Sequence, residues 1–134
     1  MEAKFSFAVD PPRGLVRIAM SGFFTLPDIH AFLEARREAH EALGCAPNQH
    51  LTLNDIRGMT AQPQTIVDAF EAMLAAPEAR SRRLAFVATS TVARSQAFRA
   101  VANRHARCFT DPAEAEAWLL AEDEDVTEVR QMAG

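Results

Sequence analysis

The run Leu84-Ala85-Phe86-Val87-Ala88 contains no polar residue. A strand with one exposed face alternates apolar and polar residues, so an unbroken apolar run is typical of a strand that is covered on both faces. Such strands occur in mostly parallel sheets that carry helices on both sides. We therefore expect residues 84–88 to lie in the middle of a parallel α/β sheet.

The segments next to this run alternate between strand and helix patterns. Residues 50–56 are expected to form a strand, followed by a loop through Arg57-Gly58-Met59. Pro63 and Pro77 bracket a helix over residues 64–76, because proline suits the start of a helix and stops its continuation. Beyond residue 88 we expect a helix from Thr89 or Ser90 to about Asn103, a short strand at 106–109, and a helix that Asp111 caps.

The start of the chain predicts a β-hairpin followed by a helix. Apolar residues recur at every second position on both sides of the turn sequence Asp10-Pro11-Pro12-Arg13-Gly14. Thr25 and Asp28 have the spacing of a capping box, and Gly44 ends the helix that follows. The complete order is β-β-α-β-α-β-α-β-α, which favours a mostly parallel sheet with an antiparallel first strand.

Length and composition indicate one globular domain. The chain has 134 residues, of which 49% are hydrophobic and 24% are charged, as in ordinary single domains. We expect the domain to cover residues 1–121 and an acidic tail to cover 122–134. No apolar stretch approaches the ~20 residues of a membrane span, and no secretory signal opens the sequence, so we expect a cytoplasmic protein.

Arginine is concentrated in one part of the chain. Residues 79–110 hold seven arginines and no acidic residue, a local charge of +7 in a chain of net charge −4. Surfaces that bind single-stranded nucleic acid interleave such charges with aromatic side chains, and this segment has only Phe86, Phe98 and Phe109. We therefore expect a solvated basic face rather than a nucleic-acid partner.

The element order, with a hairpin in front, resembles the STAS domain, the fold of bacterial anti-sigma-factor antagonists. That family carries a pattern like Asp-Leu-Ser-Gly-Val after its third strand, and this chain has Asp55-Ile56-Arg57-Gly58-Met59 there. Where the family has its phosphorylated serine this chain has Gln64, which carries no hydroxyl to modify. The resemblance implies a regulatory or interaction module without a phosphorylation switch.

Two further segments are similar to the divergent SpoIIAA-like group of small bacterial proteins, which are often grouped with CRAL-TRIO lipid-binding folds. They are residues 13–25, RGLVRIAMSGFFT, and residues 109–119, FTDPAEAEAWL. This second resemblance implies the same α/β architecture.

Polar residues follow two of the predicted parallel strands, where ligands of open α/β sheets bind. Asp55 and Arg57 follow the third strand, Thr89 and Ser90 follow the fourth, and Arg94 lies one turn into the next helix. A phosphate or carboxylate could bind at this helix start, because its free N–H groups favour an anion. The simpler interpretation is that Thr89 and Ser90 only cap the helix and that Asp55 only accepts from nearby backbone N–H groups.

The helix predicted over residues 64–76 has more apolar residues than one face can bury against a sheet. Its surplus is expected to meet a partner protein, a second copy of the chain or an apolar ligand. The residues that we assign to this interface are Ile66, Phe70, Met73 and Leu74. The alternative is that these side chains belong to the core of the domain.

No pattern for metal binding or catalysis stands out. The four histidines have no i, i+4 spacing, Cys45 and Cys108 form no C-x-x-C pair, and nucleotide-binding glycine motifs are missing. We therefore expect no metal, no cofactor and no enzyme; an enzyme would need a deep pocket that holds at least two of Ser90, Cys45 and a histidine. Our first hypothesis is a protein-interaction module with a protein partner or a homodimer, and the alternative is a small-ligand or lipid carrier with a pocket between helices and sheet.

Overall fold

The computed structural model describes residues 2–100 and 106–121. Its element order is the one predicted, and the five strands lie side by side in the order in which they occur in the chain. The first pair of strands is antiparallel and the other three pairs are parallel. The strands are β1 (Lys4–Asp10), β2 (Leu15–Gly22), β3 (Leu51–Met59), β4 (Arg83–Val87) and β5 (Ala106–Phe109), and the helices are α1 (Leu26–Leu43), α2 (Gln64–Ala75), α3 (Thr91–Ala100) and α4 (Pro112–Leu120).

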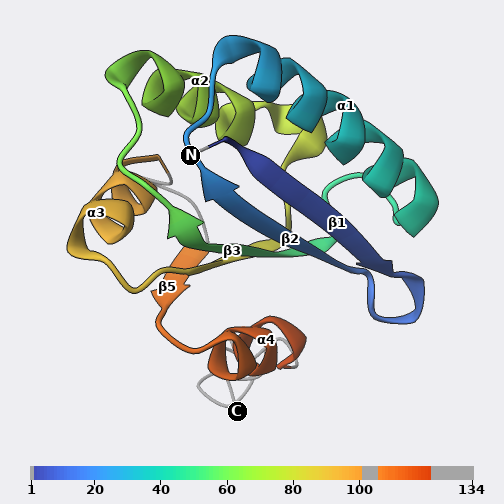
Figure 1. Cartoon of the computed structure of the whole chain (residues 1–134). Coiled ribbons are helices and arrows are strands. Elements are labelled where there is room, and N and C mark those ends of the chain that lie inside the picture. The colour runs from blue at the N-terminus through green and yellow to red at the C-terminus, as the bar shows by residue number, and fades with distance from the viewer. Residues whose placement is uncertain (1, 101–105, 122–134) are drawn as a thin grey trace.

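The sequential strand order distributes the helices unequally over the two faces of the sheet. Right-handed crossovers between parallel strands that are added in one direction place every connecting helix on the same face. Accordingly α1 and α2 lie above the sheet in Figure 1, and Ala93 of α3 belongs to the same core cluster as the buried residues of these two helices. Only α4, which follows the last strand, covers the opposite face, where it contacts β3, β4 and β5.

The apolar run that predicted a central strand is covered on both faces. All five residues of β4 are buried, and the observed strand, Arg83–Val87, starts one residue before the predicted one. Leu84 and Phe86 face the core below α1–α3, whereas Ala85 and Val87 face α4. The prediction of a mostly parallel α/β sheet is confirmed.

Helix α1 begins and ends at the predicted residues. The Thr25 hydroxyl accepts a hydrogen bond from the backbone N–H of Asp28, and the Asp28 carboxylate accepts one from the backbone N–H of Thr25, which completes the capping box. Gly44 closes the helix with φ of 70°, a left-handed conformation that costs glycine little.

Strand β3 is longer than the sequence predicted. The loop expected at Arg57-Gly58-Met59 is the end of the strand, because after a register shift Gly58 pairs with Ser21 and Met59 with Gly22. A Cβ at position 58 would lie 2.7 Å from the Cβ of Ser21, so only glycine lets the two strands stay together here. The predicted end of the third helix near Asn103 and the acidic tail at 122–134 lie outside the described residues.

Arg83 is a buried cation that holds α4 in place. Its side chain is 5% exposed, and its Nη1 donates hydrogen bonds to the carbonyl oxygens of Trp118 at 3.1 Å and Ala121 at 2.8 Å. The last carbonyls of a helix have no partner within the helix, so a cation there acts as a C-terminal cap. Arg107 also lies on this face, over the rings of Phe109 and Trp118. Of these two members of the basic segment, Arg83 is buried, whereas Arg107 is exposed.

We predict that Arg83→Met lowers the free energy of unfolding by about 2 kcal/mol, because it keeps an apolar stem but leaves the carbonyls at the end of α4 without their donor. Urea unfolding followed by tryptophan fluorescence would measure this, since the single tryptophan, Trp118, lies on α4. Arg80→Met, at an exposed position, is the control. Equal stability of the two variants would show that Arg83 does not cap α4.

Candidate functional site

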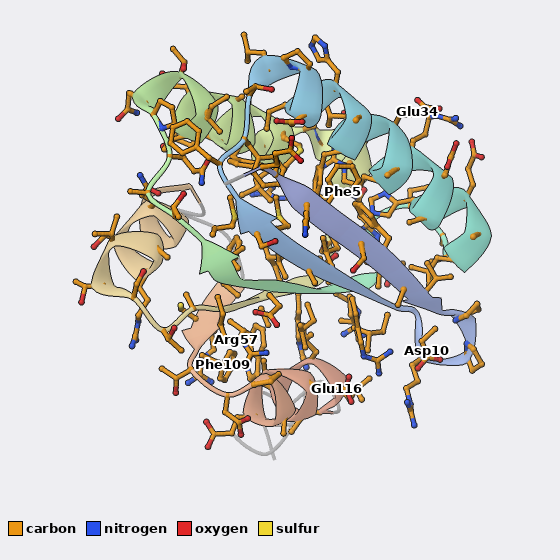
Figure 2. The ribbon with its side chains drawn as sticks, viewed as in Figure 1. Phe5, Asp10, Glu34, Arg57, Phe109 and Glu116 are labelled. Carbon is orange, nitrogen blue, oxygen red and sulfur yellow. The ribbon has the colours of Figure 1, made fainter. Side chains whose placement is uncertain are left out.

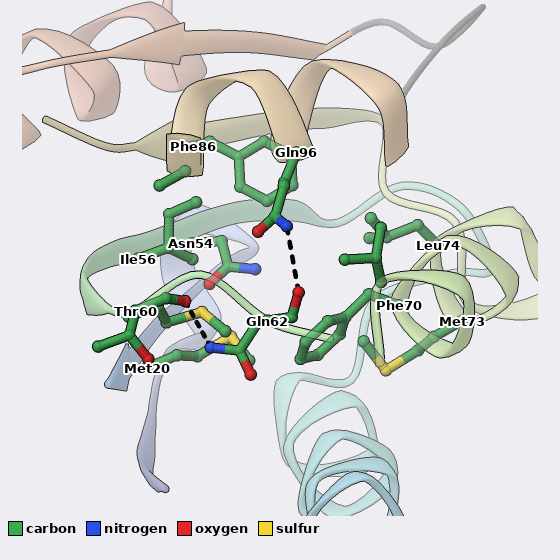
Figure 3. Close-up of a pocket in the computed structure, with 13 residues that line it drawn as sticks. Met20, Asn54, Ile56, Thr60, Gln62, Phe70, Met73, Leu74, Phe86 and Gln96 are labelled. Carbon is green, nitrogen blue, oxygen red and sulfur yellow. Dashed lines mark hydrogen bonds between the residues drawn. The ribbon is translucent and has the colours of Figure 1, made fainter. Parts of the chain in front are cut away.

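An internal pocket lies between α2, α3 and the sheet (Figure 3). Its volume is about 60 Å³. Phe70, Met73 and Leu74 of α2, which the sequence assigned to an interface, form one wall. The other lining residues are Met20, Asn54, Ile56, Met59, Thr60, Gln62, Val67, Phe86, Ala93 and Gln96. The walls are therefore largely apolar, with a few amide groups among them.

Asn54 brings a buried amide to this pocket. It lies on the central strand β3 and is 7% exposed. Its Oδ1 is buried and accepts no hydrogen bond from any residue that the structure describes. A buried acceptor without a partner costs about 1–3 kcal/mol of stability. Among the described residues, no hydrogen bond offsets this cost for Asn54 Oδ1.

Gln62 closes the loop beside the pocket. Its Oε1 accepts from the backbone N–H of Phe24 at 2.9 Å, and its Nε2 donates to the carbonyl oxygens of Gly22 at 2.9 Å and Thr60 at 2.6 Å. The backbone carbonyl of Gln62 in turn accepts from Nε2 of Gln96 on α3 at 3.4 Å. One side chain thus joins the end of β2 to the loop between β3 and α2. Figure 3 shows the hydrogen bonds of Gln62 with Thr60 and Gln96.

Two of the residues that the sequence assigned to an interface are buried in the core. Ile66 is 3% exposed and Met73 is 8% exposed, so both belong to the core of the single chain and neither is accessible to a partner. Phe70 and Leu74 are half-buried, and Phe70 packs against Phe24 with ring centroids 5.7 Å apart. The apolar surplus of α2 is therefore absorbed by the aromatic cluster near α1 and by the pocket.

Asp55 and Arg57 form an ion pair on the opposite face of the sheet. Arg57 donates from Nε to Asp55 Oδ1 at 3.0 Å and from Nη2 to Oδ2 at 2.8 Å, and its backbone N–H also reaches Oδ1. These hydrogen bonds hold the pKa of Asp55 below its usual value, although burial opposes the shift. In Figure 2 Arg57 lies on the side of the sheet that faces α4. The sheet therefore separates this pair from the pocket.

The residues after β4 mainly start the next helix. The Ser90 hydroxyl accepts from the backbone N–H of Ala93 at 3.0 Å, as an N-cap does, and Thr89 is exposed beside it. Arg94 lies near the thiol of Cys108, whose pKa is raised by burial and lowered less by this guanidinium. Four of the five residues predicted to bind a ligand have contacts within the chain: Asp55 and Arg57 pair with each other, Ser90 caps α3, and Arg94 interacts with Cys108 of β5.

Two of the three described histidines, His40 and His50, lie against each other. The rings of His40 and His50 have centroids 4.3 Å apart, and His50 Nε2 lies 3.2 Å from the Ser81 hydroxyl. Burial, and to a smaller extent the charge of Arg36, lowers the pKa of His40. Within residues 2–100 and 106–121 no three histidine, cysteine or acidic side chains are grouped to hold a metal ion.

Asn54 and Gln62 were missed by sequence reasoning, and only one of them had a signal. Asn54 lies among apolar residues of the strand that the sequence predicted over residues 50–56, and a polar side chain that such a strand buries needs a hydrogen-bond partner. Gln62 lies in a predicted loop, and nothing in its neighbours shows that the loop folds back onto β2.

The geometry defines an α/β protein with a SpoIIAA-like fold: an antiparallel first strand, parallel βα units and a single helix on the second face. The crystal structure of an uncharacterized protein of the DUF3478 family from Shewanella loihica PV-4, described as having a SpoIIAA-like fold, is similar to this chain. The two are 14% identical, with a TM-score of 0.67, over 89% of this chain and 96% of the other. The similarity confirms the predicted fold.

No family model and no curated protein matches the chain. Within the described residues, no helix combines the length and the apolar character that crossing a membrane requires.

We predict that Gln62→Leu lowers the free energy of unfolding by about 2–3 kcal/mol, because the backbone N–H of Phe24 loses its acceptor and the carbonyl of Gly22 loses its closest donor. Thermal and urea unfolding would measure the loss. Gln64→Leu is a matched control, since Gln64 is exposed and bonds only Asp68 one turn away, a contact worth a few tenths of a kcal/mol. A Gln62 variant as stable as the control would contradict the role of Gln62 as a connection between β2 and the loop.

Proposed function

We propose that this protein is a non-enzymatic, cytoplasmic binding module of SpoIIAA-like fold whose pocket between α2, α3 and β3 holds a small, mostly apolar ligand. The observation that carries the proposal is the buried Oδ1 of Asn54, which has no partner among the described residues, at the wall of a largely apolar cavity. Empty cavities in proteins are usually lined by apolar groups alone, whereas a buried polar atom needs a partner.

The chemistry of the lining supports binding rather than catalysis. The pocket residues include no carboxylate, imidazole, thiol or ammonium group, and these are the usual donors and acceptors of protons in enzymes. Gln64, at the position of the phosphorylated serine in the resembling family, opens α2 and bonds Asp68, which supports a regulatory role without a phosphorylation switch at that position.

We predict that Ala93→Val, which fills part of the pocket from α3, weakens the binding of toluene at least about tenfold and raises the unfolding temperature of the free protein. Calorimetric titration would measure the affinity for toluene. Native mass spectrometry would show whether a small molecule co-purifies with the protein. Ala72→Val is the control, because Ala72 is exposed on α2, does not line the pocket and carries the same cost of a β-branched residue in a helix. Unchanged toluene binding in Ala93→Val, or a wild type that binds neither toluene nor phenol, would contradict the proposal.

A protein-interaction role is the second candidate, and it is favoured by two exposed apolar side chains at the start of α1. Phe23 is 45% exposed and Leu26 is 53% exposed, on either side of the capping residue Thr25. Phe70 and Met73 are unsuitable as tests of this role because both contribute to the core. Leu26 can be changed without disturbing packing.

Under this second candidate, the wild type forms a homodimer or a complex with a protein partner and Leu26→Asp does not. The carboxylate is tolerated by the helix, since it lies in the first turn, but it cannot be buried in an apolar interface. Sedimentation velocity at matched concentrations would measure the assembly. Val9→Lys, at a partly exposed position at the far end of β1, is the control, and identical assembly of both variants would exclude the start of α1 as the interface.

A further inference from the structure

We infer that the ligand of this pocket is an uncharged molecule with an apolar body and one hydrogen-bond donor, an O–H or N–H group, that donates to Oδ1 of Asn54. The inference rests on the proposed function and adds the chemical class of the ligand and the residue that recognises it. It follows from the charge of the walls, from the state of each polar group in them and from the side chains that set the size of the cavity.

The absence of charge in the pocket excludes an ionised ligand group. None of its lining residues carries an ionisable side chain. A carboxylate or ammonium ion that entered would lose its hydration without gaining a counter-charge, at a cost of many kcal/mol. A ligand whose charged group remains outside in water is compatible with the walls, but the part that enters the pocket is neutral.

The other amides that line the pocket have their partners within the fold. Both ends of the Gln62 side chain bond backbone groups of β2 and the adjoining loop. The Thr60 hydroxyl lies 3.4 Å from the carbonyl oxygen of Gly22, and Gln96 donates to the carbonyl of Gln62. Of the buried side-chain oxygen and nitrogen atoms in the described residues, Asn54 Oδ1 is the one without a partner. Specificity therefore falls on Asn54, and because Oδ1 is an acceptor, the ligand must donate.

The pocket is smaller than a cavity that holds a single ring, but its walls can adapt. An apolar cavity of about 150 Å³ holds benzene, and this pocket has about 60 Å³ when empty. Met20, Met59 and Met73 line it together with Phe70. Methionine side chains have three rotatable bonds and a polarisable sulfur, so they refill space around ligands of different shape. A single ring fits once these side chains move.

The stability of Asn54 variants distinguishes a binding role of this residue from a structural role. If the residue served the fold, its replacement would destabilise the protein, as expected for the fully bonded Gln62. Because Oδ1 makes no bond, Asn54→Leu replaces an unpaired buried polar group by an apolar one of similar size, which is nearly neutral or stabilising. The same substitution removes the buried acceptor that has no partner among the described residues.

The experiment compares phenol with toluene, which have nearly the same shape and differ by an O–H in place of a methyl group. For the wild type we expect phenol to bind at least about tenfold more tightly than toluene in calorimetric titration, because it alone satisfies Asn54. For Asn54→Leu, and for Asn54→Val as a second variant suited to a strand, we expect the order to reverse and the unfolding temperature to be unchanged or higher.

Thr52→Val provides the matched control. Thr52 is buried on the same face of β3 two residues earlier, bonds Ser81 and does not line this pocket. It should lower stability but leave the preference for phenol intact.

The possible outcomes separate the inference from the proposed function. Equal binding of phenol and toluene by the wild type would mean that Asn54 is satisfied by water or plays no part, which overturns the inference and leaves the pocket as an apolar site. Tighter binding of benzaldehyde, which only accepts hydrogen bonds, than of phenol would overturn the assignment of a donor. Binding of neither phenol nor toluene would overturn the proposed function itself.

Discussion

Sequential strand order is the constraint from which the rest of this structure follows. Each parallel strand is added on the same side of the previous one, and right-handed crossovers then place α1, α2 and α3 on one face. Three helices on a five-stranded sheet bury more apolar surface than a single helix can, so the larger core and the pocket lie there. Of the described helices, the second face receives only α4, which covers β3, β4 and β5 and reaches β2 through the ion pair of Glu116 with Arg17.

Patterns that depend on neighbouring residues were readable from the sequence, whereas those that depend on distant partners were not. The unbroken run at 84–88 and the Thr25 capping box are local, and both are observed. The length of β3 was underestimated because its last residues pair with Ser21 and Gly22, more than 35 residues away in the chain. The apolar surplus of α2 was counted correctly, but its destination depends on Phe24 and Phe32, which no periodicity within α2 reveals.

The buried polar residues show the same limit and also indicate where the fold is complete. Arg83 and Gln62 are buried with their hydrogen bonds directed to backbone groups that secondary structure leaves unpaired, namely the end of α4 and the end of β2. Each therefore offsets its desolvation within the chain. Asn54 has the same degree of burial and no such compensation at Oδ1. Only the three-dimensional arrangement separates the two residues that bond backbone groups from Asn54, whose Oδ1 has no partner among the described residues.

The two candidate functions involve surfaces that are in physical contact. Phe70 lines the pocket and packs against Phe24, and the backbone N–H of Phe24 is held by Gln62, which also lines the pocket. Phe24 directly precedes Thr25 and follows the exposed Phe23. A ligand that displaces Phe70 must therefore alter the packing of the residue next to the exposed apolar side chains at the start of α1. Close-packed interiors transmit such displacements because they hold few voids, so a small-molecule site and a protein-contact surface can belong to one regulatory device in this fold.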